Sequence, residues 1–270
     1  MNSTRRTSIT TGALLIVATA AVLAAAQLVD PVLAGTDYLA QVATHPNQVA
    51  GGALLYLVAA AASAGIAISL YPVLKKTHPT LALGSVVFRT IEAVLYVVAV
   101  VSLLSVRTLG QQVSTEPSPD HALIQAVGDA LLSTREHATL AGVIAFSLGA
   151  AMYYVLFYQS RLVPRWLSGW GIAATIGMMT ACLLALFTDN PITGYTLLVL
   201  PIAVQEMVLA VWLLVTGVNP SALQESGRQP APASEAGKES RPVRQGSRTS
   251  TMTPSSPRNA EVRPSADGSL

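Results

Sequence analysis

Residues 81–106 have the sequence LALGSVVFRTIEAVLYVVAVVSLLSV, in which the only charged side chains are Arg89 and Glu92. A helix needs about 20 consecutive apolar residues to cross the roughly 30 Å hydrocarbon core of a membrane, and this run is long enough. A charge inside such a run is costly unless it faces the interior of a helix bundle. The stretch therefore predicts a transmembrane helix and a buried polar site within it.

Five further apolar runs lie on either side of this one. They are Thr11–Val29, Gly51–Val73, Ala138–Tyr158, Trp166–Phe187 and Gly194–Val215. None alternates between apolar and polar residues over about ten positions, as the strands of a transmembrane barrel do. We therefore predict an all-α fold, a polytopic membrane bundle of six transmembrane helices within residues 1–218.

The composition agrees with a membrane protein. The chain of 270 residues is 51% hydrophobic and 11% charged, whereas a soluble protein carries about 25% charged residues. The net charge is only +2, and no basic stripe interleaved with aromatic residues is present, so nucleic acid is not an expected partner. Membrane lipids are the expected surroundings. The sequence indicates neither a cofactor nor an oligomeric state.

Residues 219–270 differ in class from the rest of the chain. They are rich in Ser, Pro, Gly and Arg and contain almost no large apolar residues. Such a segment cannot bury enough apolar surface to offset the entropy lost on ordering. We predict a disordered tail.

Two connecting segments carry structural signals of their own. Asp30-Pro31 follows the first run, and proline is expected to end the helix there. The segment 107–137 is the longest connection. Apolar residues recur in it at helical spacing, which predicts a short amphipathic helix on the membrane surface. These residues are Leu123, Ile124, Val127 and Leu131.

The distribution of Lys and Arg predicts the orientation. With six spans, thirteen of these residues share one side with both termini, and the opposite side has only Arg107 and Arg135. Cytoplasmic segments are enriched in positive residues. We predict a multi-pass protein of the cell membrane with both termini in the cytoplasm.

The first run also fits a signal peptide. Arg5-Arg6 precedes it, and Ala24-Ala25-Ala26 provides a cleavage site. An apolar run of about 18 residues is longer than a signal peptide needs, which favours a retained helix. Cleavage would leave five spans.

Three charged residues lie inside the predicted spans, namely Arg89, Glu92 and Glu206. At a rise of about 1.5 Å per residue, Arg89 and Glu206 both lie about 12 Å from the cytoplasmic face, with Glu92 one turn deeper. We predict that Arg89 pairs with Glu206 in a cluster of one arginine and two glutamates. Gln205 and Tyr96 are the expected hydrogen-bonding neighbours.

The charge count of this cluster suggests more than one role. One arginine cannot neutralise two carboxylates, so we expect one glutamate to be protonated. The cluster could tie two helices together, as in a structural subunit of a membrane complex. It could also bind a proton or a small-molecule ligand, or act as a general acid in an enzyme with a lipidic or small hydrophobic substrate. We take a binding or transport-type protein as the working hypothesis.

Other chemistry is poorly supported. The histidines His45, His78, His121 and His137 are scattered, and no two have the spacing of a zinc-binding helix, so no metal site is predicted. The single cysteine, Cys182, lies in an apolar run and is interpreted as a packing residue.

The basic segment that contains Arg161, Arg165 and Trp166 fits positive-inside charge with an aromatic anchor. A site for an anionic lipid head group is the alternative.

Several short motifs together resemble one family. They are AISLYPVLK at 67–75, LALG at 81–84, FRTIEA at 88–93, SRLVPRW at 160–166, GWG at 169–171 and PIAVQEM at 201–207. In combination they resemble the bacterial integral-membrane family termed domain of unknown function 4386, over roughly Ile9–Val218. The resemblance implies a multi-helix membrane protein and no particular activity. It also implies that Arg89, Glu92, Gln205 and Glu206 belong to the family pattern, and that the first helix is retained.

Reporter fusions test the orientation. Cytoplasmic signals are expected at Lys76, Gln159 and Ser221. External signals are expected at Thr44, Ser118 and Asn190. An external signal at Ser221 would contradict six spans, and a mature N-terminus at Gln27 would identify the first run as a signal peptide.

Overall fold

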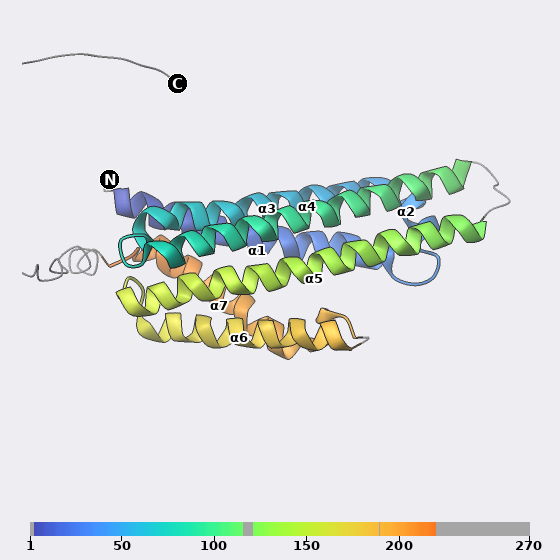
Figure 1. Cartoon of the computed structure of the whole chain (residues 1–270). Helices are drawn as coiled ribbons and strands as arrows, with labels where there is room; N and C mark the ends of the chain where they lie inside the picture. The colour runs from blue at the N-terminus through green and yellow to red at the C-terminus, as the bar shows by residue number, and fades with distance from the viewer. Residues whose placement is uncertain (1–2, 116–120, 189, 220–270) are drawn as a thin grey trace, which may run out of the picture. The chain divides into compact units, whose positions relative to one another are not determined.

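The computed structural model describes residues 3–115, 121–188 and 190–219 (Figure 1). Their elements are α1 (Ser3–Leu33), α2 (Tyr38–Thr44), α3 (Pro46–Leu74), α4 (Pro79–Thr115), α5 (His121–Ser160), α6 (Arg165–Phe187), the 3-10 turn η1 (Ile192–Tyr195) and α7 (Thr196–Val215). Within these ranges, six helical segments are long and apolar enough to cross a membrane. The predicted all-α fold with six spans is confirmed. The predicted tail, apart from Asn219, lies outside the described residues.

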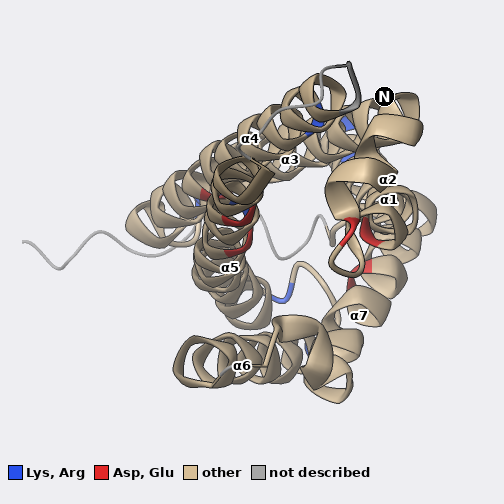
Figure 2. Cartoon of the chain, turned by 90° about the vertical axis from the view of Figure 1, so that its right-hand side faces the viewer, with Lys and Arg blue, Asp and Glu red and all other residues tan. Residues whose placement is uncertain are grey.

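The six long helices form a closed ring. Each packs against the next one along the chain, and α7 returns to pack against α1. Figure 2 shows this arrangement end-on, with α6 and α7 opposite α3 and α4. Because no helix occupies the centre, one face of every long helix is directed toward a shared interior.

The two ends of the ring differ. The start of α1, the turns that join α3 to α4 and α5 to α6, and the end of α7 lie together at one end (Figure 1). We call it the basic end, because Arg5, Lys75, Arg161 and Arg165 belong to these segments. At the opposite end, α4 and α5 extend beyond α6 and α7, and α2 packs against α4.

The predicted surface helix after Pro119 is wrong. Its residues form the beginning of α5, which is continuous from His121 to Ser160. No proline interrupts this stretch, so nothing in the backbone ends the helix. Ile124 and Leu131 pack on an apolar cluster that includes Leu39 of α2, whereas Leu123 and Val127 are exposed.

The predicted helix stop at Asp30-Pro31 is also displaced. Helix α1 contains Pro31 and ends at Leu33. A proline this close to a helix end removes only one backbone hydrogen bond. Too few helical residues follow it for a kink to change the direction of the helix.

Helix α2 is tied to α5 by a polar contact. The Tyr38 hydroxyl donates to Asp129 Oδ1 at 2.8 Å. Gly128 leaves the space for this contact, because a Cβ there would collide with the Tyr38 hydroxyl. Burial, with the Asp129 carboxylate adding to it, raises the pKa of Tyr38 above its usual value, so the hydroxyl stays a neutral donor.

The ring closes between its first and last helices. The Arg5 guanidinium donates to the carbonyl oxygens of Leu213, Leu214 and Val215 at 3.4, 2.7 and 3.3 Å. The last carbonyls of a helix lack partners within it and carry partial negative charge, so a cation is favourable there. Close approach of the two helices depends on Gly12, where a Cβ would lie 2.8 Å from the Ala210 carbonyl oxygen.

We predict that Arg5→Gln destabilises the bundle and that Arg6→Gln does not. Both changes remove one positive charge from the same segment, but Arg6 is exposed. The loss for Arg5→Gln should be about 1–2 kcal/mol in the free energy of unfolding, the size of a charged helix-end contact. Unfolding in mixed detergent measures it, and equal losses for the two variants would contradict the closure.

Candidate functional site

A cavity of about 200 Å³ lies inside the ring, and all six long helices contribute to its wall. Its lining residues are Ala18, Thr19, Val22 and Leu23 of α1, Ala59 and Ser63 of α3, Arg89, Glu92 and Tyr96 of α4, Val143 and Phe146 of α5, Met178 of α6, and Val199, Ile202, Ala203 and Glu206 of α7. The three intramembrane charges singled out in the sequence are therefore neighbours in space.

Arg89 forms an ion pair with Glu92 on its own helix. The distance from Arg89 Nη1 to Glu92 Oε2 is 3.1 Å, and the two residues are 2% and 4% exposed. Ser63 of α3 donates to the same carboxylate oxygen at 2.6 Å. The spacing i, i+3 places the two charges on one face of α4, one turn apart.

Helix α5 supports the arginine from the other side. A Cβ at Gly149 would lie only 3.0 Å from Cγ of Arg89, so the absence of a side chain there makes room for the arginine stem. The guanidinium carbon lies 4.6 Å from the centre of the Phe146 ring, which favours the positive charge. Arg89 is thus fixed by α4, α3 and α5.

Glu206 is held differently. The Tyr153 hydroxyl donates to its Oε1 at 3.4 Å, and the Thr19 hydroxyl of α1 also bonds this carboxyl. No ion pair joins Glu206 to Arg89, although the structure describes both residues. The predicted Arg89–Glu206 pair is therefore wrong. Depth in the membrane does not determine which way a side chain turns, and a carboxylate one turn away on the same helix reaches Arg89 first.

Gln205 faces away from the cavity. It is fully buried, accepts a hydrogen bond from the Tyr154 hydroxyl and donates from Nε2 to the Leu167 carbonyl oxygen at 3.2 Å. These bonds fasten α7 to α5 and α6. Tyr96 does line the cavity, where its ring stacks on Tyr56 with 6.5 Å between centroids.

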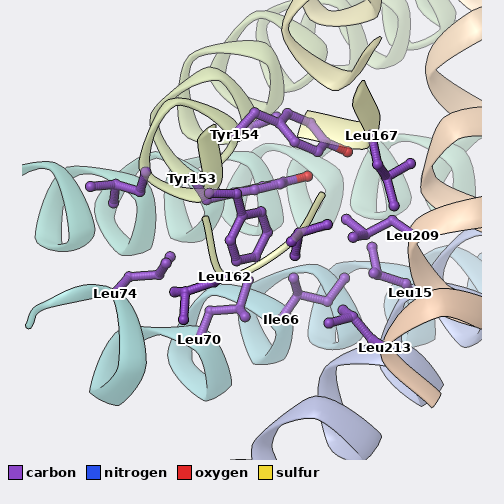
Figure 3. Close-up of a cluster of buried hydrophobic side chains, with 14 of the residues drawn as sticks. Leu15, Ile66, Leu70, Leu74, Tyr153, Tyr154, Leu162, Leu167, Leu209 and Leu213 are labelled. Atoms are coloured by element: carbon purple, nitrogen blue, oxygen red, sulfur yellow. The ribbon is translucent and has the colours of Figure 1, made fainter. Parts of the chain in front are cut away.

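The cavity is closed toward the basic end. Figure 3 shows the apolar cluster there, in which Tyr153, Ile66 and Leu209 point toward one another from different helices. On α1, α3, α5 and α7, the labelled cluster residues lie nearer the basic end than the cavity-lining residues of the same helix. The cluster therefore separates the charges from that end of the bundle.

The partly exposed residues of the cavity wall come from α1, α4, α5 and α7. Leu23 is 58% exposed, and Thr19, Val199 and Ala203 are partly exposed, whereas Arg89 and Glu92 are buried. The apolar cluster at the opposite end contains residues of α1 to α5 and none of α6 or α7 among the described residues. The partly exposed lining is thus mainly apolar, whereas the three charged residues of the cavity are buried.

Several site residues were not singled out in the sequence. Ser63 lies in a run of small residues, and Tyr153, Thr19 and Phe146 lie in apolar runs. In the sequence, only their polar or aromatic side chains, on the helix faces that line the cavity, could have indicated that they belong to the site.

The proposed lipid-binding residues do not gather at one point. Arg161, which has a positive φ of 54°, lines a second cavity of about 360 Å³ with Trp212 and Asn219. The guanidinium carbon of Arg165 lies 5.4 Å from the centre of the Tyr158 ring instead. Trp166 is 57% exposed, a position that suits an aromatic anchor.

In the described part of the chain, no group of three or more His, Cys, Asp or Glu side chains is arranged to hold a metal ion. The groups available to a ligand in the central cavity are hydroxyls, two carboxyls and one guanidinium.

A double-mutant cycle tests the pairing. Glu92→Gln leaves the buried guanidinium without its counter-charge and should cost about 3–5 kcal/mol of unfolding free energy. Arg89→Met together with Glu92→Gln should cost less than the sum of the single changes by more than about 1 kcal/mol. Glu206→Gln is the matched control, and its coupling with Arg89→Met should be smaller than that of Glu92→Gln, because no ion pair joins Arg89 to Glu206. Coupling of Arg89 to Glu206 alone would contradict the observed pair.

Comparison with known proteins identifies the family and no individual relative. The family described as domain of unknown function (DUF4386) matches residues 10–217. No curated protein and no solved structure matches the chain. The match agrees with the resemblance found in the sequence motifs and extends over all six spans. The chain belongs to the DUF4386 family.

Proposed function

We propose that the protein is a membrane-embedded binding or transport-type protein whose ligand occupies the central cavity. The observation that carries this proposal is the state of Arg89. Its Nε atom is buried and has no hydrogen-bond partner, its Nη1 contacts the Glu92 carboxylate at 3.1 Å, and the residue lines the cavity. Buried polar groups are normally satisfied, so an unpaired Nε in a residue of the cavity wall supports a further partner there.

The packing around the charges argues against a purely structural tie. A tie between helices would be expected to pack densely, as protein interiors do. Here the ion pair is contained within α4, and the space in front of it is left unfilled. Helix α7 is held by Gln205 and by Arg5, so the charges on α4 are not needed to fasten it.

The orientation that fits this proposal has the basic end in the cytoplasm. The excess of Lys and Arg in the loops of that end supports it. The apolar cluster that closes one side of the cavity then lies toward the cytoplasm.

Cysteine labelling tests whether the cavity is open. In a Cys182→Ala background, Ala203→Cys places a thiol on the cavity wall, and Val204→Cys places one on the exposed outer face of the same helix. A charged methanethiosulfonate reagent added outside intact cells should modify the thiol at position 203, because a thiol in an open cavity can ionise. A thiol in contact with lipid does not ionise and reacts poorly.

Position 204 is the matched control and should stay unmodified. Equal resistance at both positions would show that the cavity is closed, and the proposed function would then fail.

A further inference from the structure

We infer that Glu206 is the proton-binding group of the central cavity, which takes up and releases a proton while Glu92 stays ionised beside Arg89. This inference rests on the proposed function and adds the proton as a ligand of the same site. It follows from three features of the cavity: its charge count, the different partners of the two glutamates, and the burial of Glu206.

The charges of the cavity wall do not balance when both glutamates are ionised. The wall contains Arg89, Glu92 and Glu206, and no lysine or histidine lines it in the described part of the chain. The pair of Arg89 and Glu92 has no net charge. Ionised Glu206 therefore adds one uncompensated negative charge to the interior of the bundle, which is costly in a low-dielectric medium. A proton on Glu206 removes that charge.

Glu92 is held in its ionised form. Its Oε2 lies 3.1 Å from Arg89 Nη1 and receives the Ser63 hydroxyl at 2.6 Å. A proton on this carboxylate would leave the buried guanidinium without its counter-charge. Glu92 is therefore not the group that exchanges a proton.

The partners of Glu206 fit both of its protonation states. The Tyr153 hydroxyl donates to Oε1 at 3.4 Å, and the Thr19 hydroxyl also bonds this carboxyl. A hydroxyl can donate or accept a hydrogen bond. Both hydroxyls can donate to the ionised carboxylate, and one of them can accept from the protonated carboxyl while the other still donates. Unlike the guanidinium beside Glu92, these partners do not fix the charge.

The other helices offer Glu206 no further counter-charge. Thr19 faces the cavity from α1, Arg89, Glu92 and Tyr96 from α4, and Met178 from α6. On α7 itself, Gln205 bonds to Tyr154 and Leu167. Glu206 is 9% exposed, and the cavity beside it has a volume of about 200 Å³, which is room for the water that carries a proton to the carboxyl.

A carbodiimide tests the inference on the full chain in lipid nanodiscs. Dicyclohexylcarbodiimide is an apolar reagent that modifies carboxyl groups in their protonated form. Mass spectrometry of peptides should find the adduct at Glu206 and not at Glu92. Modification should fall as the pH rises, because the ionised carboxylate does not react. Sodium ions added at constant pH should give no protection.

Three variants assign the reaction to the site. Glu206→Gln should abolish the adduct. Tyr153→Phe removes a hydroxyl that stabilises the ionised carboxylate, so modification should persist to a higher pH than in the unchanged protein. Tyr158→Phe is the matched control, because it removes a hydroxyl from an exposed position of the same helix and should leave the pH profile unchanged.

Infrared spectroscopy detects the proton without requiring a reagent to enter. Exposed carboxyl groups are ionised above about pH 5. The full chain should keep the carbonyl band of a protonated carboxyl above that pH, and Glu206→Gln should lack it. An adduct at Glu92 instead of Glu206 would overturn the inference. So would protection by sodium, which would identify a metal-cation site, or the absence of both the adduct and the band.

The cysteine-labelling experiment separates this inference from the proposed function. If Ala203→Cys is modified but Glu206 gives neither adduct nor band, the open cavity stands and the proton site is rejected. If Ala203→Cys is not modified, the binding function itself is rejected, whether or not Glu206 exchanges a proton.

Discussion

The Arg89–Glu92 ion pair is the contact around which the bundle is arranged. A guanidinium in the hydrocarbon core is tolerated only beside a counter-charge, and here that charge lies one turn away on the same helix. Residues of the neighbouring helices α5 and α3 accommodate the arginine and its carboxylate partner. Helix α5 presents Gly149 to its stem and Phe146 to its charge, and α3 presents Ser63 to the carboxylate. Because Glu92 on the same helix pairs with Arg89, Glu206 of α7 has no ion-pair partner, and it faces the arginine's helix across the cavity.

The two glutamates consequently have different roles. Glu92 is committed to Arg89, whereas Glu206 has only hydroxyl partners and faces the same cavity from α7. Next to it, Gln205 points away from the cavity and bonds to α5 and α6. Adjacent residues on one helix thus separate two tasks, since one holds the helix in place and the other presents a polar group to the interior.

The sequence predicted the spans because hydrocarbon thickness imposes a length on apolar runs. The sequence-based prediction failed outside the hydrocarbon core, where this constraint on length does not apply. The polar residues from Ser133 to His137 resembled a loop, but they are compatible with a helix and α5 continues through them. The positions of Arg89 and Glu206 along their helices were estimated correctly enough to place both at one cavity. Their pairing was wrong, because a depth along the membrane normal contains no information about rotation around the helix axis. Ser63 and Tyr153 were missed because serine and tyrosine are ordinary residues in a transmembrane run.

The closure of α7 onto α1 has a consequence for biogenesis. Arg5 is synthesised 208 to 210 residues before its acceptors at Leu213 to Val215, which are among the last residues of the bundle. Before α7 is synthesised, the side of α1 that will contact α7 has no protein partner. The five long helices made earlier then form an open arc. The interior becomes separated from the acyl chains only when α7 leaves the insertion machinery. Until α7 is in place, the interior of the bundle has no protein wall on that side.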